Sequence, residues 1–274
     1  ATSGDSQTLS FGEASYKLSD LDGKDTKDFT YHITETGNVT GVTNDTTGTT
    51  IDVTVTVTDN KNGTLTATPV YSRESKTFTN KYDAQGSLPL TGTKKISGRD
   101  FKAGDEWTFT VAADTTNPTA PLPTPATVTI DPTSGKSTDF NIGTFNYTLA
   151  DLAGAKSKTF AYTVTETGTV AGVTNSAAKT ISVTVTDSGT GTLGVSSNVT
   201  GNKVIFENTY HADGKAPFEI TKKLSGRDFQ SGDVWTFTIT GDDGAPMPAK
   251  KEVKTDATSG DSQTLSFGEA SYKL

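Results

Sequence analysis

The chain has 274 residues, of which 31% are hydrophobic, and it carries a formal net charge of −8 without a single cysteine. Its acidity excludes nucleic acid and anionic lipid as main partners, and the lack of cysteine excludes disulfides and thiolate metal sites. We expect no metal and no cofactor, since 2 histidines are too few for a histidine-based metal cluster, and we expect no membrane-spanning segment.

An internal repeat organises the chain. Residues 1–18 recur without change at 257–274, which is a spacing of 256 residues. A motif at 93–101 recurs in closely related form at 221–229, at a spacing of 128 residues. The sequence therefore predicts two related domains of 128 residues that alternate along a longer array.

The domain boundaries follow from that period. We expect residues 85–212 to form one complete domain. Residues 1–84 are interpreted as the C-terminal part of a domain without its first strands, and residues 213–274 as the N-terminal part of a domain without its last strands. On this interpretation the chain is an excised segment of a larger protein.

The first predicted strands alternate apolar and polar residues, as half-buried strands do. Phe29, Tyr31 and Ile33 share one face, and residues 51–57 repeat the same period. The run 59–63 contains Asp, Asn and Gly, and it predicts a hairpin turn. It faintly resembles a calcium-binding loop, but it lacks the later bidentate Glu of an EF-hand.

Short strands also follow one another in the complete domain. Residues 88–92 spell Leu-Pro-Leu-Thr-Gly, which matches a sortase signal by its letters, but a strand follows instead of an apolar membrane segment, so we interpret them as the first strand. Further strands are predicted at 107–111, 160–166, 181–185 and 204–208. The proline-rich run 117–125 predicts a surface loop. Without any helical period, the fold class is all-β, with tandem Ig-like β-sandwich domains.

Three polar residues fall on the inward faces of these strands. Lys94, Glu166 and Asn208 each lie two positions from an apolar residue of the same strand. Side chains two apart in a strand share a face, so we expect all three to point into one core. Taken singly, each has an ordinary alternative: a polar residue at a strand end is commonly solvated, and an inward Lys commonly extends to water. Burying each of these groups without a partner would cost several kcal/mol. That all three fall on inward faces therefore favours a shared role.

Amide formation is the chemistry that suits these three groups. The amine of Lys94 would attack the side-chain carbonyl of Asn208, and ammonia would leave. Burial favours a neutral amine and a protonated carboxyl, so Glu166 could polarise the carbonyl and then shuttle protons. Such a reaction turns over once and needs no substrate cleft, so we do not expect an enzyme in the ordinary sense.

At these residues the chain resembles the streptococcal pilin isopeptide-linkage domain, an FctA-like repeat of Gram-positive pilins and large surface adhesins. The matching motifs are Thr-Lys-Lys-Ile/Leu-Ser-Gly at 93–98 and 221–226, Tyr-x-(Val/Ile)-Thr-Glu at 162–166 and 31–35, and Phe-x-Asn at 206–208 and 78–80. The resemblance implies an Ig-like fold whose first and last strands are joined by an intramolecular isopeptide cross-link. It implies a bond between Lys94 and Asn208, with Glu166 as the catalytic residue.

The partial domains repeat the pattern incompletely. Glu35 and Asn80 have no preceding Lys in their domain, and Lys222 has no following Asn. One hypothesis is that the tail of one molecule completes the head of another, with Lys222 bonding to Asn80 in a head-to-tail polymer. The alternative, which the sequence favours, is that the chain ends are a boundary within a longer array.

The resemblance predicts a structural stalk repeat of a cell-wall-anchored protein on the bacterial surface, in contact with neighbouring repeats of the same chain. A second hypothesis is a module that binds a host protein or glycan through the loop 113–127 and its counterpart at 242–252. An exposed apolar patch on these loops would favour that second hypothesis.

Overall fold

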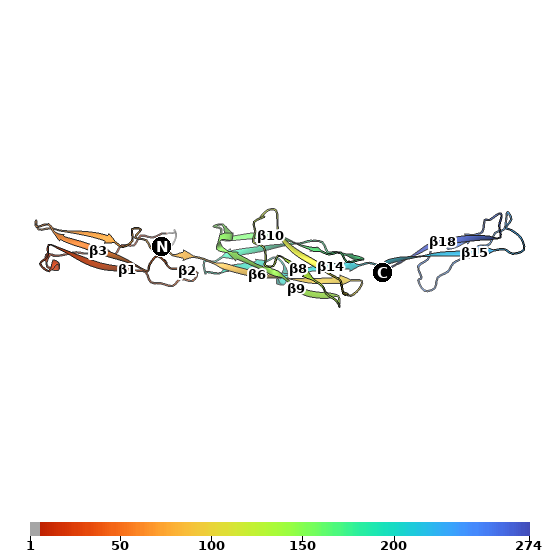
Figure 1. Cartoon of the computed structure of the whole chain (residues 1–274), viewed down its shortest axis with the longest axis horizontal. Coiled ribbons are helices and arrows are strands. Elements are labelled where there is room, and N and C mark those ends of the chain that lie inside the picture. The colour runs from red at the N-terminus through yellow and green to blue at the C-terminus, as the bar shows by residue number, and fades with distance from the viewer. Residues whose placement is uncertain (1–5) are drawn as a thin grey trace. The chain divides into compact units, whose positions relative to one another are not determined.

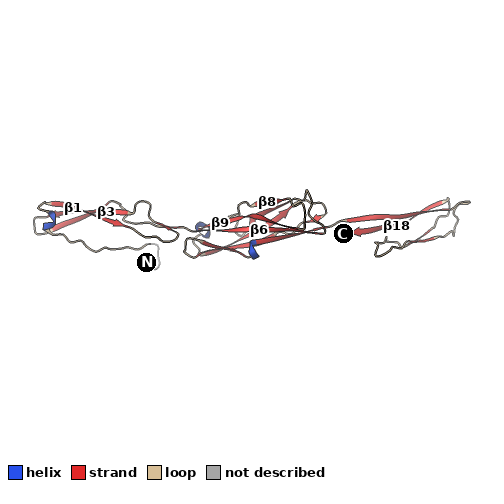
Figure 2. Ribbon diagram, turned by 90° about the horizontal axis from the view of Figure 1, so that it is seen from below, coloured by secondary structure: helices blue, strands red, loops and turns tan. Residues whose placement is uncertain are grey.

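The computed structural model describes residues 6–274 and consists almost entirely of β-strands, which dominate the ribbon in Figure 2. The strands are β1 (Thr26–Thr34), β2 (Val42–Thr43), β3 (Thr50–Asp59), β4 (Leu65–Tyr71), β5 (Lys81–Tyr82), β6 (Gln85–Ser97), β7 (Trp107–Ala113), β8 (Thr127–Ile130), β9 (Ser137–Thr148), β10 (Ser157–Thr167), β11 (Val173–Thr174), β12 (Lys179–Asp187), β13 (Leu193–Ser197), β14 (Lys203–Tyr210), β15 (Asp213–Lys223), β16 (Thr236–Thr238), β17 (Glu252–Lys254) and β18 (Ser262–Lys273). Within residues 6–274 the helical elements are three short 3-10 turns, η1 (Leu18–Leu21), η2 (Leu149–Leu152) and η3 (Thr200–Asn202). The all-β class predicted from the sequence is confirmed.

The first of two compact units contains the residues up to 86 together with 148–157 and 186–194. Its main sheet is antiparallel, in the order β1–β3–β4 (Figure 1). The short strands β2 and β5 pair separately. The hairpin predicted at 59–63 is confirmed, because β3 ends at Asp59, which lies opposite Leu65 of β4.

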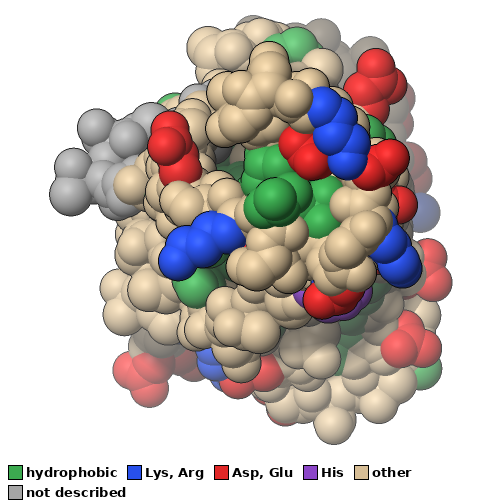
Figure 3. Space-filling view, turned by 90° about the vertical axis from the view of Figure 1, so that its left-hand side faces the viewer, with side chains coloured by type: hydrophobic (Ala, Val, Ile, Leu, Met, Phe, Trp, Pro, Cys, Tyr) green, Lys and Arg blue, Asp and Glu red, His purple; other side chains and the backbone are tan. Residues whose placement is uncertain are grey.

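The core of the first unit is small. Its buried members are Leu21, Val53, Val55 and Val57, with Tyr16, Phe29, Ile33, Leu65 and Tyr71 partly buried against them. Figure 3 shows the face that forms the left-hand side of Figure 1, where a group of apolar side chains is visible among charged and other residues. A sheet needs a second layer to cover its apolar face, and these residues have only part of one.

The second unit contains residues 87–147, 158–185 and 195–274. Its main body has a sheet in the order β13–β12–β10–β7–β8 and a sheet in the order β11–β14–β6–β9. Figure 1 labels β8 and β10 of the former and β6, β9 and β14 of the latter. In the latter, β6 and β14 are neighbours and run parallel, with Lys94 opposite Phe206. The first and last strands of the sandwich, β6 and β14, therefore lie side by side.

Aromatic side chains from both sheets form the core between them. The largest buried ones are Trp107, Phe109, Phe145, Tyr147, Phe160, Tyr162 and Phe206. The rings of Phe109 on β7 and Phe206 on β14 lie 4.8 Å apart between centroids, so the two sheets pack face to face. Each such ring stabilises the fold by roughly 1.5–3 kcal/mol through burial. The predicted β-sandwich is confirmed.

The runs at 88–92 and 117–125 form the strand and the loop that the sequence predicts. Leu88 and Leu90, from the Leu-Pro-Leu-Thr-Gly run, are only 4% and 1% exposed within β6. The run is therefore a buried strand. The proline-rich stretch 117–125 lies between β7 and β8 and forms a loop, which Tyr162 holds by donating a hydrogen bond to the Pro121 carbonyl at 2.8 Å.

Residues 213–274 form two antiparallel ladders, β15 with β18 and β16 with β17. β15 has β18 as its single sheet neighbour. In the first unit, the pattern that leads from Phe78 to Asn80 does not form a strand, although its counterpart in β14 does. In β14 this segment is held by parallel pairing to β6, whereas no such partner lies beside residues 76–80.

Candidate functional site

Lys94 is a fully buried charged side chain of the sandwich. It lies in the middle of β6, which has β14 on one edge and β9 on the other, and it is 0% exposed. Its Nζ atom lies 4.7 Å from the centroid of the Trp107 ring. Removal from water lowers the pKa of Lys94, and the nearby carboxylate of Glu166 offsets this only in part. A buried amine with a lowered pKa is a better nucleophile, because more of it is neutral.

Glu166 reaches Lys94 from the opposite sheet. It lies near the end of β10, paired with Phe109 of β7, and its side chain is 0% exposed. The Glu166 Oε1 atom is 3.0 Å from Lys94 Nζ. Nζ is buried with no hydrogen-bond partner among the described residues, so this contact is a close approach of amine and carboxyl without hydrogen-bond geometry. The second carboxyl oxygen, Glu166 Oε2, is likewise buried with no hydrogen-bond partner among those residues.

Asn208 completes the group from β14. Its Nδ2 atom donates to Glu166 Oε1 at 2.5 Å and to Asn175 Oδ1 at 3.2 Å. Its Oδ1 atom accepts a hydrogen bond from the backbone N–H of Ser176 at 2.8 Å. A backbone N–H can only donate, so this contact fixes which end of the carboxamide carries the oxygen.

The structure thus brings together the three residues that the sequence placed on inward strand faces, and both Lys94 and Asn208 contact the same oxygen of Glu166. One detail differs from the expectation. Glu166 lies at the amide nitrogen of Asn208, and the Ser176 N–H lies at the carbonyl oxygen. The hydrogen-bond donor at the carbonyl oxygen is therefore a backbone group, and the carboxyl of Glu166 faces the amide nitrogen.

Sequence reasoning missed Asn175 and Ser176, which follow β11 in a connecting segment. Strand periodicity says nothing about residues outside strands. A usable signal exists in the repeat, because Gly-Val-Thr-Asn stands at 41–44 and again at 172–175. Both asparagines make the same contact: Asn44 donates to the Gly37 carbonyl at 2.9 Å and Asn175 to the Gly168 carbonyl at 2.8 Å.

The first unit holds the same arrangement without its lysine. Asn80 Nδ2 donates to Glu35 Oε1 at 2.8 Å, and the backbone N–H of Asp45 donates to Asn80 Oδ1 at 2.9 Å. Glu35 is half-buried and Asn80 is exposed, whereas Glu166 and Asn208 are buried. The remaining predicted site residue, Lys222 on β15, is half-buried with its Nζ atom 4.8 Å from the centroid of the Trp235 ring.

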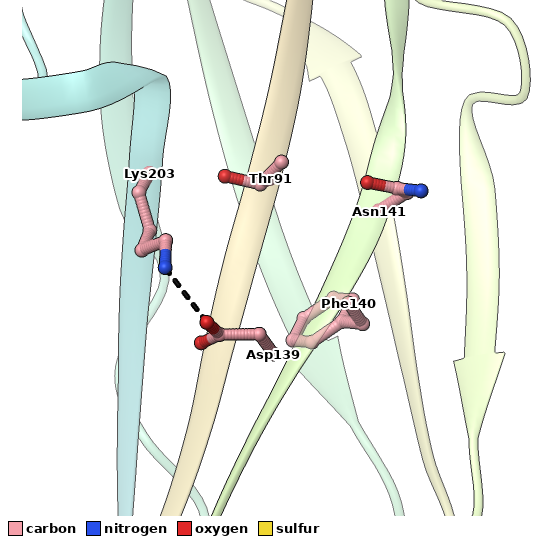
Figure 4. A pocket seen from close by; sticks show the side chains of 5 residues that line it. All are labelled: Thr91, Asp139, Phe140, Asn141 and Lys203. Carbon is pink, nitrogen blue, oxygen red and sulfur yellow. Dashed lines mark hydrogen bonds and ion pairs between the residues drawn. The ribbon is translucent and has the colours of Figure 1, made fainter.

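The surface of the sandwich carries a separate open pocket of about 220 Å³, lined by Thr91, Asp139, Phe140, Asn141 and Lys203 (Figure 4). Lys203 Nζ donates to Asp139 Oδ2 at 2.8 Å, and Thr93 donates to the other oxygen. These two hydrogen bonds lower the pKa of Asp139. The ion pair of Lys203 and Asp139 connects β14 to β9 across β6. The residues that line the pocket include no nucleophile paired with a base.

Residues 6–274 hold no group of three or more His, Asp or Glu side chains placed to bind a metal ion. In the same stretch, no helix has the length and apolar character needed to cross a membrane.

Comparison with known proteins gives a family. Residues 1–83 and 90–211 match the family model FctA, described as the Spy0128-like isopeptide containing domain. Among solved structures, the chain is similar to the major pilin protein T-13 from Streptococcus pyogenes, at 17% identity over 69% of this chain and 78% of that chain, with a TM-score of 0.31. It is also similar to the T3.2 major pilin of the same organism, at 15% identity over 69% and 79% of the two chains, with a TM-score of 0.24. No curated protein matches. Because the family match covers most of the sequence, this chain belongs to the FctA family of Spy0128-like isopeptide containing domains.

Proposed function

We propose that the chain is a structural repeat of a pilus-like stalk on the surface of a Gram-positive bacterium, in which Lys94 and Asn208 join through an isopeptide bond. The observation that carries the proposal is the buried contact of Lys94 Nζ and Asn208 Nδ2 with one oxygen of Glu166. Membership of a family described by its isopeptide content supports it.

The reaction exchanges one amide bond for another. The Nζ atom of Lys94 attacks the Cγ atom of Asn208, the Cγ–Nδ2 bond breaks, and ammonia leaves with a proton passed from Lys94 through Glu166. The N–H of Ser176 stabilises the charge that develops on Oδ1, and Trp107 helps to keep water out. Holding amine and amide in contact supplies the effective concentration that an unactivated amide otherwise lacks.

The position of the bond suits a load-bearing role. β6 and β14 are parallel neighbours, so a force that enters at the start of β6 and leaves at the end of β14 slides the two strands past each other. A covalent bridge between Lys94 and Asn208 would carry that force before the backbone hydrogen bonds do. By analogy with disulfides, closing a loop of about 100 residues also stabilises the fold by roughly 4–5 kcal/mol.

Intact mass tests the bond. We expect a mass lower by one ammonia than the sequence predicts, and a cross-linked peptide containing Lys94 and Asn208 after digestion. Lys94→Met, Glu166→Gln and Asn208→Ala should each restore the full mass, because each removes the nucleophile, the proton carrier or the electrophile.

Matched controls lie one position away on the same strands. Lys95 and Glu207 form an exposed ion pair at 3.1 Å on the outer face, so Lys95→Met and Glu207→Gln change the same chemical groups outside the core. Both control variants should keep the ammonia deficit. A full, unmodified mass for the unaltered protein would contradict the proposal.

Binding of a host protein or glycan gains no support from the loop 113–127. Leu122 is its exposed large hydrophobic side chain, at 46%, while Ala120 is buried. A single exposed leucine is ordinary on a protein surface and does not make a patch. We therefore retain the structural role as the proposed function.

A further inference from the structure

The side-chain amide of Asn208 is held at both ends by one short segment, the residues that follow β11. β11 pairs with the end of β14 in antiparallel register, with Thr174 opposite Thr209. The next residue along, Asn175, therefore comes to lie beside Asn208. Its Oδ1 atom accepts a hydrogen bond from Asn208 Nδ2 at 3.2 Å, and the backbone N–H of Ser176 donates to Asn208 Oδ1 at 2.8 Å. Asn175 thus contacts the nitrogen, and Ser176 the oxygen, of the same carboxamide.

The orientation of Asn175 is fixed from its other end. Its Nδ2 atom donates to the Gly168 carbonyl at 2.8 Å. A carbonyl oxygen can only accept, so the nitrogen of Asn175 must face Gly168 and its oxygen must face Asn208. Turning the carboxamide of Asn175 round would place oxygen against oxygen on one side and N–H against N–H on the other, and both hydrogen bonds would be lost.

Gly168 is itself held closely in place. It follows directly after β10, two residues beyond Glu166. A Cβ atom on Gly168 would lie 2.6 Å from the Glu106 carbonyl oxygen and 2.8 Å from Cδ1 of Trp107, so a side chain would not fit here without displacing its neighbours. The end of β10 therefore supplies both Glu166 and the carbonyl that orients Asn175.

Two acceptors thus face the nitrogen of Asn208, and one donor faces its oxygen. Glu166 Oε1 accepts from Nδ2 at 2.5 Å, in addition to the hydrogen bond that Asn175 accepts. This arrangement suits a carboxamide, whose nitrogen carries two N–H donors and whose oxygen accepts. A carboxylate of the same shape would place an oxygen against the oxygens of Asn175 and Glu166. A site built on hydrogen bonds to one group rejects an isostere that cannot make them.

We infer that Asn175 is a positioning residue for the isopeptide bond and that it makes the site select asparagine over aspartate at position 208. The inference rests on the proposed function, because it assigns a role in that reaction. Once Lys94 Nζ has attacked Cγ, the nitrogen of Asn208 takes up the proton that Lys94 gave to Glu166, and it leaves as ammonia with its own two hydrogens. Asn175 holds one of those N–H groups away from Glu166, so the electron pair that the nitrogen regains in the tetrahedral intermediate points to the Glu166 proton.

The first unit offers a matched control. Asn44 occupies the equivalent position in the repeat and donates to the Gly37 carbonyl at 2.9 Å, as Asn175 does to Gly168. Asn44→Ala removes the same local hydrogen bond in a unit that does not contain Lys94. A general effect of losing such a bond would therefore appear in both variants.

Solvent exchange of the Asn208 side-chain amide tests the contact without the reaction. In the Lys94→Met variant no bond can form, so the two Nδ2 protons stay on Asn208 and can be followed by NMR. Adding Asn175→Ala should speed the exchange of one of these protons by roughly tenfold, because that proton loses its acceptor. Adding Asn44→Ala should change neither proton. Unchanged exchange with Asn175→Ala would overturn the inference, whether or not Lys94 and Asn208 react in the unaltered chain.

The rate of bond formation tests the role in the reaction. Samples taken at intervals during cell-free synthesis of the chain should show the loss of one ammonia by intact mass. Asn175→Ala should slow this loss by roughly tenfold, and Asn44→Ala should leave its rate unchanged. An unaltered chain that loses no ammonia would overturn the proposed function and the role of Asn175 with it. Equal rates of ammonia loss with and without Asn175→Ala would overturn only the role of Asn175.

Asn208→Asp separates selectivity from a general effect on the fold. The carboxyl that it introduces can join Lys94 with loss of water, which carries away the acid proton and one proton of the amine. Asn175→Ala should speed this reaction by roughly tenfold, because it removes an oxygen that faces the introduced carboxyl. A residue that only held the fold together would slow the reactions of both side chains. Equal rates of water loss with and without Asn175→Ala, including none in either protein, would overturn the selectivity.

Discussion

Burying a lysine beside a glutamate and an asparagine destabilises the fold as long as the three side chains are not bonded to one another. Lys94 Nζ and Glu166 Oε2 are buried without hydrogen-bond partners, and an unsatisfied buried polar group costs roughly 1–3 kcal/mol. Converting the amine and the carboxamide into one secondary amide removes the charge of Lys94 and two N–H donors of Asn208. The residues that would react under the proposed mechanism are therefore also residues that destabilise the unreacted core.

This cost predicts a pH dependence in the Asn208→Ala variant, in which Lys94 stays a free amine. Burial lowers the folded-state pKa of Lys94 below its ordinary 10.5, so between the two values the unfolded state binds more protons. The free energy of unfolding should then rise with pH across that window. Urea unfolding at a series of pH values measures the slope.

The double variant Asn208→Ala with Lys94→Met is the control for this titration, because all other groups are unchanged. It should lack the extra slope that Lys94 contributes. Equal slopes for the two proteins would mean that burial does not perturb the amine.

Strand periodicity was enough to predict that Lys94, Glu166 and Asn208 meet, since each belongs to a strand whose inward face is plain in the sequence. It could not predict that Ser176 N–H binds the Asn208 carbonyl. That contact depends on the path of a connecting segment after β11, and backbone donors leave no trace in residue identity. For the same reason it could not predict that Glu166 contacts the nitrogen of the Asn208 amide and not its oxygen.

At the scale of elements, a buried ion pair fixes the turn between β6 and β7. Arg99 donates to both oxygens of Asp105, at 2.6 and 2.9 Å, and Asp105 is 1% exposed. Burial alone would raise the pKa of Asp105, but the hydrogen bonds from Arg99 and the Lys102 N–H outweigh it and lower the pKa. Removing one partner of a buried pair leaves the other uncompensated, which typically costs about 3–5 kcal/mol.

Asp105→Asn should therefore lower hydrogen-exchange protection in β7 by about 100-fold, equivalent to ~3 kcal/mol of local stability. The equivalent pair, Arg227 with Asp233, is 48% and 17% exposed in its side chains. Asp233→Asn should reduce protection in β16 by less than about tenfold, because solvent screens the pair. Equal losses at the two sites would show that burial does not set the strength of this contact.

A strand could be predicted from the sequence wherever its neighbouring strand also lies in the chain. The alternation in β3, β7, β10 and β12 gave the strands, and the polar run at 59–63 gave the hairpin between β3 and β4. Residues 6–17 and 262–273 mark the limit of this reasoning. Their sequences are identical and their structures are not, because a strand is stabilised by its neighbour and no local pattern reports whether that neighbour is present.

At the scale of the whole molecule, the proposed bond between Lys94 and Asn208 would divide the chain into parts that can extend under force and a part that cannot. The residues between the two ends of the bond would form a closed loop, with tension bypassing it. A stalk built from such repeats would keep its length under load, whereas one held by hydrogen bonds alone would lengthen as its sandwiches open.

Single-molecule pulling from the two ends of the chain tests this difference. The Asn208→Ala variant should show an additional unfolding step of roughly 40 nm, since about 114 residues are released at ~3.5 Å each. The unaltered protein should lack that step, and the Glu207→Gln control should lack it too, because its bond is intact. Extensions from residues outside the loop should be the same in all three proteins. A 40 nm step in the unaltered protein, at about the force seen in the variant, would mean that β6 and β14 slide apart freely and that no covalent bridge carries the load.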